Sequence, residues 1–123
     1  MEYGKFIKPR EVEIDGTTYA ISQIPALESQ DIYRIVAKSI ADNGVIGITM
    51  IDSHTARTML SYVAVRIDDQ WFSLDTEMRI NNYLVNKNTM ERLIVLMVRE
   101  NWGFLIDGNL LDVLGMEEAV ESE

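Results

Sequence analysis

The dipeptide Asp15-Gly16, which lies between two alternating segments, is the feature that most constrains the fold of this chain. Asp-Gly favours a type I′ turn, which needs positive φ at both central residues and joins two antiparallel strands through a two-residue loop. Such a loop pairs Val12 with Tyr19 and so sets the register. One face of the predicted hairpin is then apolar: Val12, Ile14, Tyr19 and Ile21. Because two strands alone are only marginally stable in water, other elements have to cover this face.

Four segments after the hairpin carry apolar residues at the three- and four-residue spacing of amphipathic helices. The first predicted helix follows Pro25 and covers about 26–41. The second starts at the N-cap pair Asp52-Ser53, and its apolar stripe continues to Ile67. A short third helix is capped by Asp75 and reaches Leu84, and a very apolar fourth follows Asn88 and spans Met90–Val98. The Asp68-Asp69-Gln70 sequence is typical of a turn. The apolar stretch 44–51 fits either a short buried strand or a packed loop.

These patterns predict an α+β fold in which an N-terminal β-hairpin is followed by a small bundle of about four helices. Residues 1–116 are expected to form a single domain, since neither a repeat nor a low-complexity linker interrupts them. Residues 117–123 contain four acids and predict a disordered acidic tail.

Composition excludes several classes of function. The chain has 11 Lys and Arg against 20 Asp and Glu, a net charge of −9. This balance disfavours non-specific nucleic-acid binding and attachment to an anionic membrane surface. The chain has no cysteine and one histidine, which removes thiolate metal sites and cysteine nucleophiles. The longest apolar stretch is far too short to span a membrane, and the default compartment is the cytoplasm.

No residue pattern predicts catalysis, a metal site or a cofactor. His54 is the single candidate base, and a surface position in a first helical turn is its simpler interpretation. The carboxylates of Asp68 and Asp69 fall in a predicted turn, where acids are usually solvated. Gly44 and Gly47 lack the Gly-Lys-Ser/Thr of a phosphate-binding loop. The residues therefore predict a non-enzymatic domain that binds protein, including copies of itself.

Several short sequence motifs resemble motifs of a group of phage tail assembly chaperones. The group typically opens with Lys-Pro-x-Glu-Val-x-Val-Asp-Gly-x-x-Tyr, and the segment Lys8–Tyr19 is similar to it, with a following Ile24-Pro25-Ala26. Met59–Val65 resembles the group's Met-Ser-Tyr-Val-Ala-Val block, and Met90–Leu93 and Asn101–Phe104 resemble its Trp-Glu-x-Leu and closing Asn-Phe-x-Phe. The resemblance covers about residues 5–115. Residues 40–52 and 81–83 depart from the pattern.

The resemblance implies a non-enzyme of long-tailed phages that binds the tape measure protein and keeps it soluble while tail tube subunits polymerise around it. Such chaperones act in the host cell cytoplasm and are absent from the mature virion. Many also exist in a frameshift-extended form that recruits the tail tube protein. Whether this chain has such a form, and whether it is a homo-oligomer, stays open.

Surplus apolarity in the predicted helix Met90–Val98 and in the segment Phe104–Leu114 suggests where a partner would bind. The contact residues predicted there are Leu96, Trp102, Phe104, Leu105, Leu110, Leu111 and Leu114. The competing interpretation is that such residues fill the protein's own core. Two other functions remain as alternatives, a structural head–tail or tail component of the virion and an acidic inhibitor that mimics nucleic acid.

Overall fold

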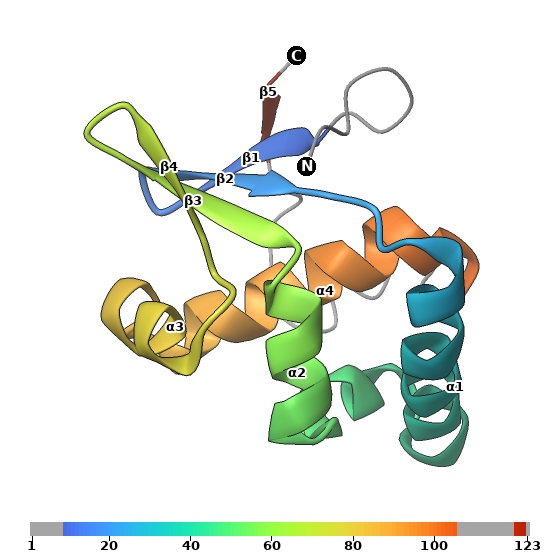
Figure 1. The fold of residues 1–123 in the computed structure, drawn as a ribbon. Coiled ribbons are helices and arrows are strands. Elements are labelled where there is room, and N and C mark those ends of the chain that lie inside the picture. The colour runs from blue at the N-terminus through green and yellow to red at the C-terminus, as the bar shows by residue number, and fades with distance from the viewer. Residues whose placement is uncertain (1–8, 106–119, 123) are drawn as a thin grey trace.

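The computed structural model of the chain describes residues 9–105 and 120–122, and Figure 1 shows their two layers, a β-sheet with all the helices on one of its faces. The sheet is antiparallel with strand order β4-β3-β2-β1-β5. The elements are β1 (Arg10–Ile14), β2 (Thr17–Ile21), α1 (Ala26–Asn43), η1 (Val45–Met50), α2 (Ser53–Leu60), β3 (Val63–Ile67), β4 (Gln70–Ser73), α3 (Glu77–Tyr83), α4 (Lys87–Trp102), η2 (Gly103–Leu105) and β5 (Val120–Ser122). The predicted α+β class is confirmed.

The N-terminal hairpin has the predicted turn and register. Asp15 and Gly16 have φ values of 50° and 83°, as a type I′ turn requires. Val12 is opposite Tyr19, and the apolar face predicted for the hairpin is buried against the helices.

A second hairpin, β3–β4, stands where the sequence analysis extends a helix to Ile67, and that extension is wrong. Helix α2 ends at Leu60, and β3 begins three residues later. The reason is local: 63–67 is rich in β-branched residues at a period of two, which suits a strand. The predicted turn follows, with φ values of 52° at Asp68 and 64° at Asp69. The strand β3 then pairs with β2 and enlarges the sheet.

The other edge of the sheet is β5, which pairs with β1 over Glu11–Glu13. The sequence predicts a disordered tail over 117–123; within that range Val120–Ser122 form β5, and residues 117–119 and 123 lie outside the described residues. The pairing comes from tertiary structure, because three residues with two polar side chains carry little strand signal of their own.

The helices differ from the predictions mainly at their ends. The stretch left open between strand and loop is a 3₁₀ helix, η1. The cap of α3 is Thr76, whose hydroxyl accepts from the Arg79 N–H, and not Asp75 as predicted. Helix α4 starts at Lys87 and its cap is Asn86, whose side chain accepts from the Asn88 N–H, so the predicted cap Asn88 lies inside the first turn.

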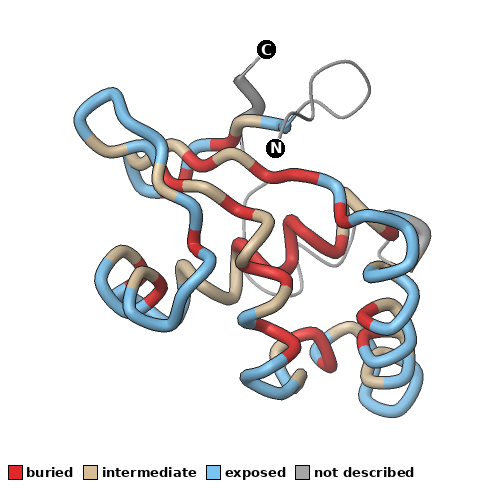
Figure 2. Tube along the Cα trace, in the orientation of Figure 1, coloured by how far each residue is buried: buried red, intermediate tan, exposed pale blue. Residues whose placement is uncertain are grey.

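The core lies between the sheet and α4, which crosses beneath it (Figures 1 and 2). Six consecutive residues of α4, 93–98, are buried. A helix buried on consecutive positions is covered on all sides. Here β2, α2, η1 and η2 all contact it. Helix α4 is thus the central element of the core.

Candidate functional site

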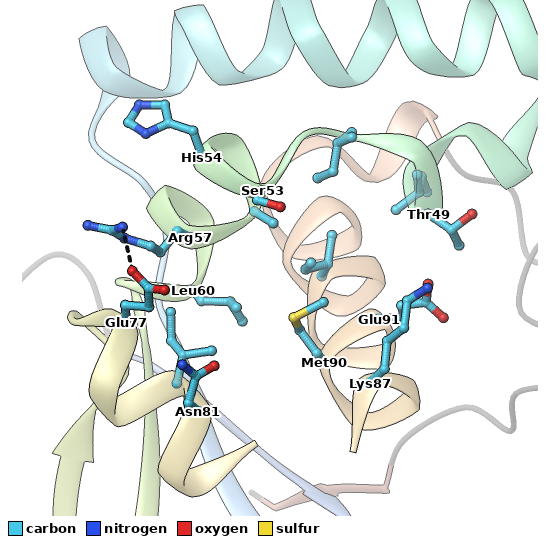
Figure 3. A pocket seen from close by; sticks show the side chains of 15 residues that line it. Thr49, Ser53, His54, Arg57, Leu60, Glu77, Asn81, Lys87, Met90 and Glu91 are labelled. Atoms are coloured by element: carbon cyan, nitrogen blue, oxygen red, sulfur yellow. Dashed lines mark ion pairs between the residues drawn. The ribbon is translucent and has the colours of Figure 1, made fainter. Parts of the chain in front are cut away.

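A groove of about 570 Å³ opens between the helical elements η1, α2, α3 and α4 (Figure 3). Its walls come from η1 and α2, from α3, and from the first two turns of α4. The lining residues are Ile48, Thr49, Ile51, Ser53, His54, Ala56, Arg57, Leu60, Glu77, Ile80, Asn81, Lys87, Met90, Glu91 and Ile94. Its volume is within the range of protein sites that bind small ligands or partner side chains.

The floor of the groove is apolar. Ile48, Leu60 and Ile94 are almost fully buried there, while Ile51 and Met90 are half-buried and form its accessible surface. Methionine is unbranched and polarizable, so the Met90 side chain can adapt to apolar groups of different shape.

The rim of the groove is charged but balanced. The Arg57 Nη1 lies 3.5 Å from the Glu77 Oε2, an ion pair that connects α2 with α3 at the mouth of the groove. The Lys87 Nζ lies 3.8 Å from the Glu91 Oε2 along α4. The Arg57–Glu77 pair is largely exposed, as is Lys87 in the second pair, so each pair contributes at most about 1 kcal/mol to stability. An apolar floor inside a neutralised rim suits an amphipathic segment whose polar side faces water.

The η1 wall depends on one glycine. Gly47 packs directly on the backbone of Ser39 in α1, and the Ser39 hydroxyl donates to the Gly47 carbonyl oxygen at 2.7 Å. This contact holds η1 beside α1 and thereby places Ile48 in the floor.

The α2 wall depends on the predicted cap. One carboxylate oxygen of Asp52 accepts from the Thr55 N–H at 3.0 Å and the other from the Thr55 hydroxyl at 2.6 Å. These hydrogen bonds lower the pKa of the Asp52 carboxyl below its ordinary value.

Leu96, Trp102 and Leu105 are the predicted contact residues whose side chains the structure describes, and none of them lines this groove. Leu96 and Trp102 are 7% and 6% exposed and belong to the core. The Trp102 Nε1 donates to the Ser29 hydroxyl at 3.0 Å, and its ring packs against Tyr33 with 6.0 Å between centroids. For these two residues the structure agrees with the competing interpretation, that they fill the protein's own core.

The structure describes the other predicted contact residues only in part. Leu105 is half-buried in η2. Phe104 also belongs to η2, but the description does not extend to its side chain. Leu110, Leu111 and Leu114 lie outside the described residues.

A partner contact was predicted on the helix Met90–Val98, but not the groove that this helix forms with η1, α2 and α3. The residues of the groove come from η1, α2, α3 and α4, between Ile48 and Ile94, and no short motif unites them. The available signal was the apolar stripe of the fourth helix, whose residues Met90 and Ile94 line the groove.

His54 is exposed at the edge of the groove in the first turn of α2, as the sequence analysis expects. Between 9 and 105 and over 120–122, no group of three or more His, Asp or Glu residues is placed to hold a metal ion. Within the same ranges, no helix has both the length and the apolarity to cross a bilayer.

Comparison with known proteins returns no match, whether the chain is compared with protein-family models, curated proteins or solved structures.

Proposed function

We propose that this chain is a non-enzymatic tail assembly chaperone of a long-tailed phage. It binds amphipathic helical segments of the tape measure protein and keeps that protein soluble in the host cytoplasm during tail tube assembly. The observation that carries the proposal is the groove, an apolar floor with a charge-balanced rim, in a chain whose phrases resemble this group of chaperones.

The motifs that resemble those of the chaperone group lie on secondary-structure elements of the domain. The segment similar to the family's opening forms β1, the turn and β2, and the block Met59–Val65 spans the end of α2 and the start of β3. Two of the four phrases therefore specify the sheet and its junction with the helices. This placement supports a shared scaffold, whereas the phrases themselves include no catalytic signature.

The physical properties of the chain suit a holding function. A net charge of −9 keeps a complex with an apolar partner soluble through mutual repulsion between copies. An amphipathic helix inserts side chains at a spacing of three and four residues into a groove of this kind, and the burial of each large apolar side chain contributes roughly 1.5–3 kcal/mol. A few such side chains give useful affinity without requiring a rigid match.

The test compares two substitutions of the same type. Met90→Glu places a charge on the accessible floor of the groove, and Met78→Glu makes the same change on α3, where Met78 is 69% exposed and does not line the groove. Each variant is tagged, co-expressed with the flanking tail genes and recovered with its partners for mass spectrometry. We expect the wild type and Met78→Glu to recover one long helical protein in soluble form. We expect Met90→Glu, with unchanged circular dichroism, to lose it.

Two results would contradict the proposal. If no long helical protein becomes soluble in the presence of the wild-type chain, the chaperone function fails. If the chain is instead an integral part of purified virions, the structural tail or head–tail alternative replaces it. Equal recovery by Met90→Glu and the wild type would remove the groove as the binding site while leaving the function intact.

A further inference from the structure

Strand β4 forms one edge of the sheet, and within residues 9–105 and 120–122 only β3 pairs with it. The opposite edge differs, because β5 covers β1 there. Proteins usually protect an open sheet edge with a charged side chain, a proline or a bulge. The residues of β4, Gln70–Ser73, include neither a charge nor a proline, and they pair with β3 at consecutive positions, without a bulge. The edge is therefore suited to pairing with another strand.

The hydrogen-bond pattern of the β3–β4 hairpin determines which backbone groups face the open edge. The Leu74 N–H donates to the Val63 carbonyl oxygen at 2.9 Å. Because hydrogen-bonded and non-hydrogen-bonded pairs alternate in an antiparallel ladder, Trp71 and Ser73 direct their N–H and C=O groups away from β3. The carbonyl oxygen of Ser73 already accepts from the Arg79 Nη1 at 3.3 Å. Trp71 therefore offers the donor and acceptor pair that is most open to another strand.

The Trp71 side chain is 43% exposed beside these backbone groups. It lies opposite Arg66, on the face of the sheet away from the helices, because the next pair, Val65 and Phe72, faces the core. Tryptophan is enriched among the residues that contribute most to the affinity of protein–protein contacts.

We propose that β4 pairs with β4 of a second copy of this chain about a two-fold axis, so that two sheets join into one continuous antiparallel sheet. Opposite residues of an antiparallel pair share a face of the sheet. Within β4, Trp71 can therefore lie opposite Trp71 or opposite Ser73 of the second copy. The Arg79 side chain occupies the Ser73 carbonyl, which favours the first register. In that register the two Trp71 residues exchange both backbone hydrogen bonds, and their indole rings pack together across the axis.

The charges next to β4 are complementary in this register. With Trp71 opposite Trp71, Ser73 lies opposite Asp69 of the second copy. The guanidinium of Arg79, which is held at Ser73, then faces the turn of the second copy that carries the carboxylates of Asp68 and Asp69. Charges of opposite sign attract at this distance, and the two-fold axis produces the same contact at both ends of the paired strands.

The existing ion pairs extend this contact into a network. Within one copy, the Arg66 Nη2 lies 2.9 Å from the Asp69 Oδ1, and the Arg79 Nη1 lies 3.3 Å from the Asp75 Oδ1. When Arg79 of one copy approaches Asp69 of the other, the order of charges becomes Asp75, Arg79, Asp69, Arg66. Signs alternate along this order, so the contact forms without reversing either existing pair.

The proposed dimer leaves the groove accessible, because no residue of β4 lines the groove. The pairing does not depend on the proposed function. If that function holds, a dimer presents two grooves to successive segments of one long partner, which raises the apparent affinity without any new contact.

Cysteine cross-linking of the purified chain tests the register. The natural chain has no cysteine, so Trp71→Cys contains a single thiol. Opposite residues of a hydrogen-bonded pair have Cα atoms about 5.5 Å apart, which is within the range of a disulfide. The matched control is Ile46→Cys, because Ile46 is 48% exposed and lies on η1. With the same oxidant, we expect Trp71→Cys to form a covalent dimer about tenfold faster than Ile46→Cys, because pairing raises the effective concentration of its thiol.

Sedimentation velocity over a range of concentrations tests the non-covalent dimer. We expect the wild type and the control Ile46→Lys to associate into a dimer as concentration rises. Trp71→Lys, with unchanged circular dichroism, should remain monomeric, because two lysines then face each other across the axis. An equimolar mixture of Trp71→Lys and Trp71→Glu should dimerise again, because opposite charges then face each other.

Four results would overturn the proposal. The wild type could sediment as a monomer at every concentration, or its dimer could persist unchanged in Trp71→Lys, which would assign the contact to another surface. Equal cross-linking rates for Trp71→Cys and Ile46→Cys, or a mixture of the lysine and glutamate variants that stays monomeric, would exclude the register. Since no partner protein is added, these results are independent of whether the chain is a chaperone.

Discussion

Replacement of Gly47 by alanine tests whether one backbone contact holds the η1 wall of the groove. A β-carbon at this position would lie 2.6 Å from the Ser39 carbonyl carbon and closer still to its oxygen. Because these atoms are backbone, no side-chain rotation relieves the clash, and η1 has to move away from α1. Overpacking of this severity costs about 3 kcal/mol. The strained Ser39 hydrogen bond adds about 1 kcal/mol, and the lower chain entropy of alanine in the unfolded state returns about 1 kcal/mol.

The expected net loss is therefore about 3 kcal/mol in the free energy of unfolding, or a fall in Tm of roughly 10 °C for a domain of this size. Urea unfolding followed by circular dichroism measures it. Gly103→Ala is the matched control, because Gly103 has helical φ and ψ of −55° and −24° and open space at its β-carbon position. The control should be neutral or slightly stabilising. If Gly47→Ala unfolds at the same urea midpoint as the wild type, the reasoning from this contact is refuted.

Three further predictions concern the fold that supports the site. Asn101→Ala leaves the Ile24 N–H without the Oδ1 that accepts from it at 2.8 Å, and urea unfolding should show a loss of about 1–3 kcal/mol. Because the hydrogen bonds from Thr55 lower the pKa of Asp52 in the folded state, the charged cap stabilises the protein above the unfolded pKa of about 3.9. That stabilisation is lost as pH falls through the folded pKa, so the stability difference between wild type and Asp52→Asn should shrink in acid; an unchanged difference would exclude this cap effect. Gly16→Ala forces alanine to φ of +83° and should cost about 1–2 kcal/mol with the native circular dichroism retained.

The sequence predicted most accurately those structural features that depend on residues adjacent in the chain. The Asp15-Gly16 turn, its strand register and its buried face were predictable because a two-residue turn leaves one pairing and a period of two leaves one apolar face. The second hairpin was not recognised, although Asp68-Asp69 was predicted as a turn. Apolar residues at 56, 59, 60, 63 and 67 fit a helical stripe, and only the β-branched run after Leu60 argued for a strand. A short apolar segment is compatible with the periodicity of a helix and with that of a strand, and pairing with β2 decided for the strand.

The sequence by itself determined the α+β class, the N-terminal hairpin, the central place of the fourth helix and the acidic, cysteine-free character of the chain. Each of these follows from local turn chemistry, periodicity or composition. Only the tertiary structure decided that Leu96 and Trp102 belong to the core, because burial depends on which elements surround α4. It also decided that Ile48, Leu60 and Met90 share one groove, since residues so far apart in the chain meet only when η1, α2 and α4 pack together.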